Sequence, residues 1–210
     1  MRYIVLFSLA FVFLVSACIN QLTPTKEELL IGCRAEVPNI NFGTPLLYKN
    51  VLWSHMPLKI YIDFAESNKV KLFNVWKTET LADFRKGMRN WEEKTNGLIT
   101  FSETNDTEDY DIYVKWVGEL PVTATEKTVG QGGPHFIIEC NDYTVIDNAT
   151  IEMIVDLTGC RGQYISMHEL GHVIGFGHSQ NASDVMYHHT VGCVTEITED
   201  ELSVIRKLYG

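Results

Sequence analysis

The chain has 210 residues, of which 45% are hydrophobic, 11% aromatic and 21% charged, which is typical of a folded globular protein and unlike disordered, collagen-like or coiled-coil chains. Its length predicts one domain of catalytic size plus a short leader. The 17 basic and 27 acidic residues give a formal net charge of −10, which argues against nucleic acid or an anionic membrane surface as the principal partner, because both would repel the chain.

The N-terminal residues are typical of an export signal. Arg2 supplies a positive start, and the apolar run Tyr3–Val15 is too short to span a bilayer comfortably. The run leads into Ser-Ala-Cys18, which resembles the lipobox of prokaryotic lipoproteins, whose cysteine is lipidated after cleavage. The same small residues suit ordinary signal peptidase, and an uncleaved anchor is a third interpretation. We expect residues 1–17 to be a lipoprotein-type signal peptide and the chain to be exported, either anchored at the cell surface through a lipid on Cys18 or secreted.

Residues 18–50 are predicted to be a linker or a short pro-segment, because prolines and scattered polar residues mark them. The folded unit is expected to begin near Val51. In residues 58–64, apolar and polar side chains alternate with the period of two that is typical of a strand buried on one face. A helix is predicted from Thr80, an expected N-cap with Asp83 at the capping-box position, to a stop at Asn96-Gly97. Its apolar stripe is formed by Leu81, Phe84, Met88 and Trp91.

Further strands and a closing helix are predicted in the rest of the chain. The strands are expected at residues 98–102, 111–117, 135–140 and 149–155. Thr198 and Glu201 bound a capping box, and apolar residues at helical spacing follow it to the C-terminus. A strand, a long helix and a run of strands before the next helix predict the fold class α+β, with a mixed sheet and helices packed on one of its faces.

The cysteines agree with export. Apart from Cys18, the chain has an even number of them, which an oxidising exterior would favour pairing. These are Cys33, Cys140, Cys160 and Cys193. Four cysteines allow three connectivities, and the sequence does not choose among them.

The candidate chemistry lies in the segment from His168 to His178, which reads HELGHVIGFGH. On a helix, residues four apart leave the same face, so His168 and His172 can bind one Zn²⁺. Gly175 can take a positive φ, end the helix and turn the chain back, so that His178 becomes a third ligand. Three imidazoles leave the fourth position open for water, as a catalytic zinc site requires. Glu169 can reach that water without taking a coordination position, as a general base must.

The same segment, with Ser179 after it and Asp184-Val-Met186-Tyr187 downstream, resembles the metzincin zinc peptidases and is most similar to the matrixins among them. Gly171, Ser179 and the Met-Tyr pair match the matrixins, whereas Phe176 is more like the astacins. The resemblance covers residues 51–210. It implies the metzincin (zincin-like) fold: a mixed, twisted five-stranded sheet, two long helices, a methionine turn and a C-terminal helix.

For the site, the resemblance implies that residues 51–210 are a zinc metalloprotease catalytic domain with one catalytic Zn²⁺. His168, His172 and His178 would be its ligands, Glu169 the catalytic base and Met186 the turn residue beneath the metal. Tyr187 receives no catalytic role, because the astacin tyrosine stands two places after the methionine, where this chain has His188.

The implied function is that of a zinc-dependent endopeptidase, which hydrolyses peptide bonds of extended protein or peptide substrates through a zinc-activated water and a glutamate base. We expect a monomer that binds substrate as an added strand along the edge strand near His135–Ile138. The alternative is an exported surface binding protein or adhesin that keeps a zinc-stabilised but catalytically silent fold. The intact Glu169 and the open fourth position favour catalysis.

The sequence departs from the matrixin pattern in two respects. Residues 132–148 lack the expected series of His and Asp ligands, so no structural zinc is predicted. The acidic stretch Asn105–Asp111 could hold calcium, although a solvated charge run is the favoured interpretation. A segment around Cys33 is only remotely comparable to the latency cysteine of matrixin zymogens, and a disulfide is favoured there over a thiol that binds the metal.

Overall fold

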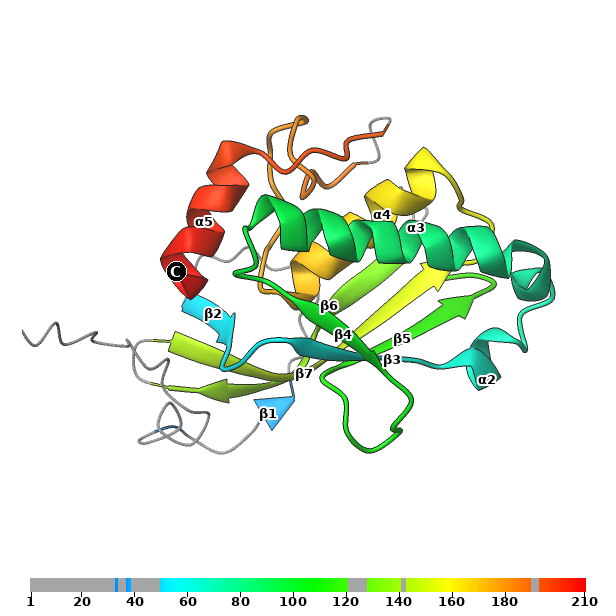
Figure 1. Ribbon diagram of the computed structural model, residues 1–210, viewed down its shortest axis with the longest axis horizontal. Coiled ribbons are helices and arrows are strands. Elements are labelled where there is room, and N and C mark those ends of the chain that lie inside the picture. The colour runs from blue at the N-terminus through cyan, green and yellow to red at the C-terminus, as the bar shows by residue number, and fades with distance from the viewer. Residues whose placement is uncertain (1–32, 34–36, 39–49, 121–127, 141–142, 190–192) are drawn as a thin grey trace, which may run out of the picture.

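The computed structural model describes residues 33, 37–38, 50–120, 128–140, 143–189 and 193–210 (Figure 1). The predicted signal peptide and Cys18 lie outside these residues, as does most of the predicted linker. None of the helices in the described ranges combines the length and the apolar surface that a bilayer-spanning segment needs. The strands are β1 (Val37–Pro38), β2 (Asn50–Trp53), β3 (Leu58–Ile62), β4 (Phe101–Thr104), β5 (Ile112–Val117), β6 (Gly130–Glu139) and β7 (Tyr143–Ile154). The helices are α2 (Phe64–Ser67), α3 (Phe73–Lys94), α4 (Cys160–Val173) and α5 (Glu199–Tyr209).

The strands of the described ranges form one mixed sheet, in the order β1-β6-β7-β5-β3-β4, with β2 pairing with β7. Pairing is parallel among β3, β4, β5 and β7 and between β2 and β7. At the other edge, β6 is antiparallel to β7, and β1 is antiparallel to β6. The predicted α+β class is confirmed, and the strands expected from the sequence correspond to β3 to β7. The short strands β1 and β2 were not predicted, since segments of 2 and 4 residues give no readable alternation.

The core lies between the sheet and the helices on one of its faces. β3 buries Leu58, Ile60 and Ile62, as the predicted alternation requires, while the residues between them are only partly buried. α3 buries the predicted stripe of Leu81, Phe84, Met88 and Trp91. Figure 1 shows α3 and α4 side by side over the same face of the sheet.

Helix α3 begins at Phe73, so its predicted start at Thr80 is wrong. Thr80 is buried within the helix, and its hydroxyl donates to the carbonyl of Val155 at 3.4 Å. Asp83 accepts the N–H of Gly159 at 2.5 Å. Both residues that suggested an N-cap therefore bind the segment that leads into α4. The predicted end is confirmed, since the helix stops at Lys94, just before the positive φ angles of Asn96 and Gly97.

Close packing of α3 against α4 positions the functional segment. A Cβ added at Gly87 would lie 3.1 Å from the Cβ of Ser166, so a larger residue would push the helices apart. The Trp91 indole donates to the carbonyl of Met167 at 2.9 Å, and its ring lies 5.7 Å from that of Phe176. α3 thus contacts α4 at the residue before His168, and it also contacts the chain just beyond the C-terminal end of α4.

Two disulfides join distant parts of the chain. Cys33 pairs with Cys140 at the end of β6, and Cys160 at the start of α4 pairs with Cys193. This is one of the three connectivities that the sequence left open. The pairing of Cys33 agrees with the expected disulfide and leaves no thiol at this residue for a metal.

Candidate active site

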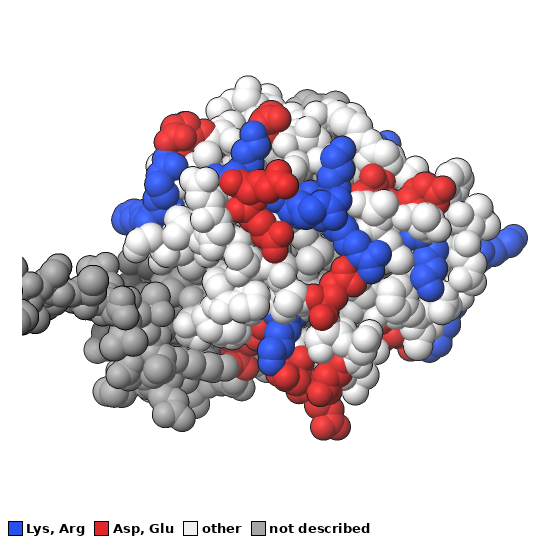
Figure 2. Space-filling view, in the orientation of Figure 1, with Lys and Arg blue, Asp and Glu red and all other residues white. Residues whose placement is uncertain are grey.

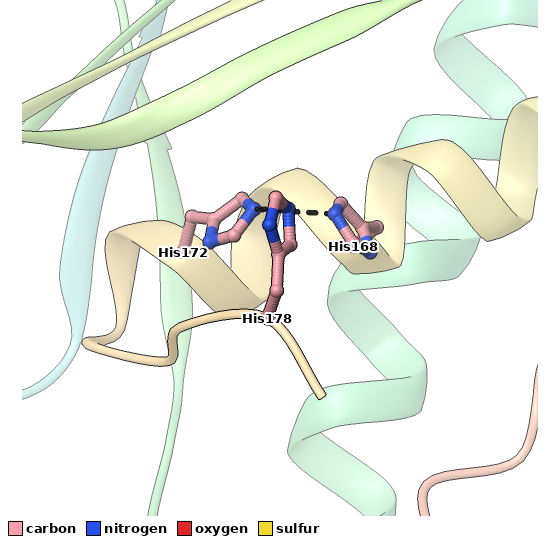
Figure 3. A group of neighbouring side chains, drawn as sticks. All are labelled: His168, His172 and His178. Carbon is pink, nitrogen blue, oxygen red and sulfur yellow. Dashed lines mark hydrogen bonds between the residues drawn. The ribbon is translucent and has the colours of Figure 1, made fainter. Parts of the chain in front are cut away.

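Three imidazoles meet beside the C-terminal half of α4 (Figure 3). His168 and His172 project from one face of the helix, and His178 reaches the same point from the chain that follows the helix. The Nε2 atoms of His168 and His172 are 3.1 Å apart, and those of His172 and His178 are 3.2 Å apart. Within the described ranges, these three histidines form a group of possible metal ligands, because one nitrogen of each lies within 4.8 Å of the others. The structure thus brings together the three ligands expected from the sequence.

The hydrogen bonds of the other ring nitrogens determine which lone pairs face inward. The Nδ1 atom of His168 lies 2.7 Å from the carbonyl oxygen of Val185, and that of His172 lies 2.9 Å from the carbonyl oxygen of Phe176. A carbonyl can only accept, so each Nδ1 donates a proton and each Nε2 presents a lone pair. Two facing lone pairs repel each other unless a cation lies between them. Tetrahedral Zn²⁺ with bonds of about 2.0–2.1 Å needs nitrogens roughly 3.3 Å apart, so the donor set fits zinc.

Burial keeps two of these imidazoles neutral. It lowers the pKa of His168 to about 4 and the pKa of His172 to about 3. The neighbouring imidazoles lower both pKa values further, whereas the hydrogen bonds to the carbonyls of Val185 and Phe176 oppose the shift. Neutral imidazole is the metal-binding form, so a metal at neutral pH would displace no proton from either inward-facing nitrogen.

The bend that brings His178 into the site is a Schellman turn. Gly175 has a φ of 111°, its N–H donates to the carbonyl of His172 at 3.1 Å, and the N–H of Phe176 donates to the carbonyl of Gly171 at 2.9 Å. This is the hydrogen-bond pattern in which a glycine ends a helix. The predicted bend at Gly175 is therefore confirmed. A Cβ at this position would also lie 2.7 Å from the carbonyl oxygen of Val51, so β2 leaves no room for a side chain.

Two aromatic side chains that were not predicted from the sequence bind the last carbonyls of this helix end. The Trp53 indole donates to the carbonyl of Val173 at 2.8 Å, and the Tyr209 hydroxyl donates to that of Ile174 at 2.9 Å. The same hydroxyl accepts the N–H of Trp53 at 3.1 Å. The last carbonyls of a helix lack partners within the helix. The Schellman turn satisfies those of Gly171 and His172, and side chains from β2 and α5 satisfy those of Val173 and Ile174. No local pattern reveals such contacts, because they join distant parts of the chain.

Glu169 is enclosed between α4 and β6. It is 4% exposed, and burial raises its pKa to about 8, although a hydrogen bond from the Gly132 backbone opposes the shift. A Cβ at Gly130 would collide with the Glu169 carboxylate, and one at Gly132 would lie 2.7 Å from the Glu169 carbonyl oxygen. The two glycines therefore let β6 approach Glu169 closely. The run Gly130-Gln-Gly-Gly133 is the sequence signal for such an approach, and it was not among the predicted site features.

The segment after His178 forms a tight turn beneath the histidines. The Sδ atom of Met186 occupies the space where a Cβ on Gly171 would lie, so Met186 packs directly against α4. Asp184 accepts hydrogen bonds from Ser179 at 2.5 Å and from Thr198 at 3.0 Å. The expected methionine turn is thus in place, and the carbonyl of Val185 within it orients His168.

The predicted capping box of α5 has a second role that the sequence did not reveal. Thr198 and Glu201 make the reciprocal hydrogen bonds of such a box. The Oε2 atom of Glu201 accepts the N–H of Thr198 at 2.9 Å, while its Oε1 atom accepts the N–H of Met186 at 3.0 Å. Because Glu201 is 4% exposed, one buried carboxylate joins the start of α5 to the methionine turn.

The edge of β6 differs from what the sequence analysis expected. β1 pairs with it, with Val37 opposite Ile137 and Pro38 opposite Phe136. The expected substrate edge, His135–Ile138, is therefore contradicted at Phe136 and Ile137, where the chain itself occupies the edge. Residues 130–134 of β6, which include the glycines beside Glu169, have no strand on their outer edge in the described part of the chain.

In the acidic stretch Asn105–Asp111, between β4 and β5, several carboxylates form ion pairs or hydrogen bonds within the protein. Asp109 forms an ion pair with Lys59 at 2.6 Å, and Asp111 accepts the backbone N–H of Lys59 at 2.7 Å. Asp106 accepts the backbone N–H of Glu108 at 2.9 Å. Each of the three aspartates thus has a partner within the protein.

In the segment after Met186, His188 lies beside His178. The ring of His188 lies 6.3 Å from that of His178, and its Nδ1 atom lies 3.3 Å from the carbonyl oxygen of Ser179. The backbone carbonyl of Tyr187, and not its phenol, accepts a hydrogen bond from Tyr164 at 3.2 Å. His188 is thus the residue of this segment whose ring contacts the third imidazole.

Comparisons with known proteins agree with this geometry. Residues 52–210 match the family model described as matrixin. The chain is 26% identical to the hatching enzyme of Paracentrotus lividus over 91% of its own length and 32% of that protein. It is 22% identical to karilysin of Tannerella forsythia over 75% of its own length and 33% of that protein. A shorter match to rat matrilysin is 41% identical over 25% of this chain and 21% of that protein. The matches thus span about a third or less of each relative.

Proposed function

This chain belongs to the matrixin family of peptidases, and from that premise we propose that it is a zinc-dependent endopeptidase with Glu169 as its general base. One observation carries the proposal: three imidazoles converge from the two sides of the Gly175 bend, with the Nε2 atom of His172 at 3.1 Å from that of His168 and at 3.2 Å from that of His178. A buried carboxylate follows directly after the first of them. Three such ligands leave one position of a tetrahedral metal for water or substrate.

Each residue of the site has a separate task in the proposed reaction. His168, His172 and His178 hold Zn²⁺, and when bound there it supplies Lewis acidity toward the scissile carbonyl and toward the attacking water. Glu169 accepts the proton of that water and passes it to the leaving amine. Burial against β6 raises the Glu169 pKa to about 8 in the absence of a metal. The positive charge of Zn²⁺ beside the carboxyl would oppose this shift and favour the ionised form, which is the form that a base requires.

Substrate is proposed to lie extended along the part of the β6 edge that β1 leaves open. Gly130–Pro134 borders Glu169, and a peptide that pairs with this edge would have its backbone recognised first. The β1 strand limits this pairing, because Ile137 already pairs with Val37 and Phe136 with Pro38. Selectivity for side chains would come from the walls beside the imidazoles, of which His188 is one.

The domain organisation follows as part of the same proposal. Residues 51–210 form the peptidase domain, residues 18–50 a linker or short pro-segment, and residues 1–17 a signal peptide. The enzyme would act outside the cell that makes it, as a secreted protein or as a lipoprotein held by Cys18.

A zinc-stabilised binding protein remains the alternative from a different functional class. Such a protein would need the metal for stability, but it would need neither an open ligand position nor a buried carboxylate beside the metal. The position of Glu169 in a cradle of two glycines therefore favours the enzyme.

The proposal is tested by the substitution Glu169→Gln, which keeps the shape of the side chain and removes its basicity. We expect the variant to bind zinc as the native chain does and to cleave an unfolded protein at least about 100-fold more slowly, the usual contribution of a general base. Glu196→Gln is the matched control, because Glu196 is an exposed glutamate, and its activity should be unchanged. Turnover retained by Glu169→Gln with normal zinc content would remove Glu169 from this role.

A further inference from the structure

The beginning of α3 carries an exposed apolar surface. Leu72 is 44% exposed, Val75 64% and Trp76 38%, and they are the large hydrophobic side chains exposed within the described ranges. They lie within one turn of each other at the start of the helix. Three lysines, Lys69, Lys71 and Lys77, stand beside them in the sequence. We call these six residues the α3 patch.

The charge of the α3 patch is opposite to that of the whole chain. The protein has a formal net charge of −10, whereas the stretch from Glu66 to Glu79 contains these three lysines and two glutamates, one at each end, and so has a formal charge of +1. One lysine is partly neutralised, since Lys69 pairs with Glu66. Lys77 lies over the ring of Phe64, with its Nζ atom 4.3 Å from the ring centroid. Figure 2 shows Lys and Arg side chains at the edge of the molecule where α2 and the start of α3 lie in Figure 1.

The helix terminus adds to this positive charge. Leu72 is the N-cap residue of α3 and makes no side-chain capping hydrogen bond, and the first turn contains no acidic residue. Acidic side chains normally stabilise this end of a helix by opposing its dipole. Their absence leaves the positive end of the dipole to act together with the lysines.

We propose that the α3 patch docks on a membrane surface that carries anionic lipid headgroups. Leu72, Val75 and Trp76 would insert at the boundary of headgroups and acyl chains, where tryptophan is favoured. The lysines would attract the headgroup phosphates while their stems stay in the apolar boundary. The positive charge of these lysines complements the anionic headgroups, so the α3 patch is the part of this net acidic protein that we expect to face the membrane.

The size of the patch favours a lipid surface over a protein partner. A stable protein interface buries about 800 Å² on each partner and involves roughly 20 residues or more, whereas the exposed apolar part of this patch consists of three side chains. A lipid surface needs only a few inserted side chains with basic residues nearby, and it gives weak binding that a second anchor can strengthen. A lipid on Cys18, as the sequence predicts, would be such an anchor, although the α3 patch does not depend on it.

The position of the patch is compatible with an accessible active site. Trp91, which contacts the ring of Phe176 beside the site, stands 15 positions after Trp76 on the same helix. At a rise of 1.5 Å per residue, this separates the patch from the site by roughly 22 Å along the helix. Docking through the α3 patch would therefore leave the histidines free for substrate.

Trp76 provides a specific probe for the test. The chain has 4 tryptophans, and Trp53, Trp91 and Trp116 are each 2% exposed or less. Residues 1–50 contain none, so the leader cannot contribute to the signal. In vesicles whose acyl chains carry bromine as a quencher, loss of tryptophan fluorescence therefore reports the insertion of Trp76. The vesicles would contain about three parts phosphatidylcholine to one part phosphatidylglycerol.

We expect the full chain to show this quenching with the anionic vesicles and much less of it with phosphatidylcholine alone. Val75→Asp should weaken the response by roughly tenfold, because it places a charge at the apolar centre of the patch. Ala82→Asp is the matched control, since Ala82 is also exposed on α3 but lies about 10 Å further along the helix. It should change the response by less than about threefold.

Three results would overturn the proposal. The first is the absence of Trp76 quenching in the native chain with anionic vesicles. The second is equal quenching of the native chain and Val75→Asp. The third is a Trp76 that acrylamide cannot quench before vesicles are added, since the patch would then already be covered by a second copy or by another segment of this chain. Peptidase activity enters none of these readouts, so the proposal stands or falls separately from the proposed function.

Discussion

Gly175 is the residue whose backbone conformation decides whether the third imidazole reaches the other two. Its φ of 111° lies in a region that L-residues rarely adopt, and β2 lies where its side chain would be. His178 stands three positions further along the chain, so a change in this turn would shift the His178 ring directly.

We predict that Gly175→Ala destabilises the protein by more than about 2 kcal/mol, because left-handed strain and the contact with the Val51 carbonyl add together. Zinc affinity should fall at least tenfold, roughly the loss expected when a ligand is misplaced. Chemical denaturation and competition with a zinc-binding dye would measure the two effects.

Gly97→Ala is the matched control for that substitution. Gly97 also has a positive φ, 79°, beyond the end of a helix, but a Cβ there would meet nothing within 4 Å. Its cost should be about 1 kcal/mol, with zinc affinity unchanged. If both alanine variants bound zinc like the native chain, the bend would not be what positions His178.

At the scale of secondary-structure elements, α5 contacts the methionine turn and through it the three-histidine site. Glu201 accepts the N–H of Met186, and the carbonyl of the preceding Val185 accepts the proton of His168. The start of α5 is thus connected to the His168 ring by two hydrogen bonds and one peptide unit.

We predict that Glu201→Ala lowers both stability and zinc affinity. Loss of the cap should cost about 1 kcal/mol, and the unpaired buried N–H of Met186 a further 1–3 kcal/mol or so. Zinc affinity should fall roughly tenfold or more, as for other residues that orient a ligand. Asp200→Ala, which removes an exposed acid from the same turn, should cost less than about 1 kcal/mol. Equal zinc affinity of the two variants would contradict the connection to His168.

The elements also show where sequence reasoning works and where it fails. The capping box of α5 could be predicted because Thr198 and Glu201 bind each other locally. The same reasoning failed at Thr80 and Asp83, because their side chains bind Val155 and Gly159 in the distant segment before α4. The pattern, a threonine with an acidic residue three positions later, is the same at Thr80 and at Thr198. Only the tertiary contacts show that the first lies inside a helix and the second begins one.

The candidate site, too, could be predicted only in part from the sequence. The three histidines, Glu169 and the bend at Gly175 follow from spacing within eleven residues of one helix and its turn. The supporting contacts from Trp53 and Tyr209 do not, because these residues lie 120 and 35 positions from the carbonyls that they bind. The β1 strand, which pairs with Phe136 and Ile137 on the edge of β6, was missed for the same reason.

At the scale of the whole molecule, zinc should contribute to stability without being required for the fold. The buried core between the sheet and the helices contains large side chains such as Trp53, Trp91, Trp116 and Phe84, and none of these depends on a metal. The two disulfides join the N-terminal segment to β6 and the start of α4 to the chain before α5.

We therefore predict that a chelator abolishes hydrolysis while circular dichroism still reports a folded protein. Zinc in excess of its dissociation constant by about 100-fold should stabilise the native state by about 2.7 kcal/mol, which is a rise in Tm of roughly 5–11 °C for a domain of this size. Calcium added to the chelated protein is the control for a general effect of divalent cations. Complete unfolding on chelation would assign the metal a structural role instead.

X-ray absorption at the zinc edge tests the central claim most directly, because it reports the atoms bound to the metal in solution. For the purified zinc-loaded chain, we predict one zinc per molecule, with three imidazole nitrogens and one oxygen at about 2.0–2.1 Å. In His178→Ala the third imidazole should be lost from the spectrum. A substoichiometric metal, a sulfur ligand, or a spectrum unchanged by His178→Ala would contradict the account.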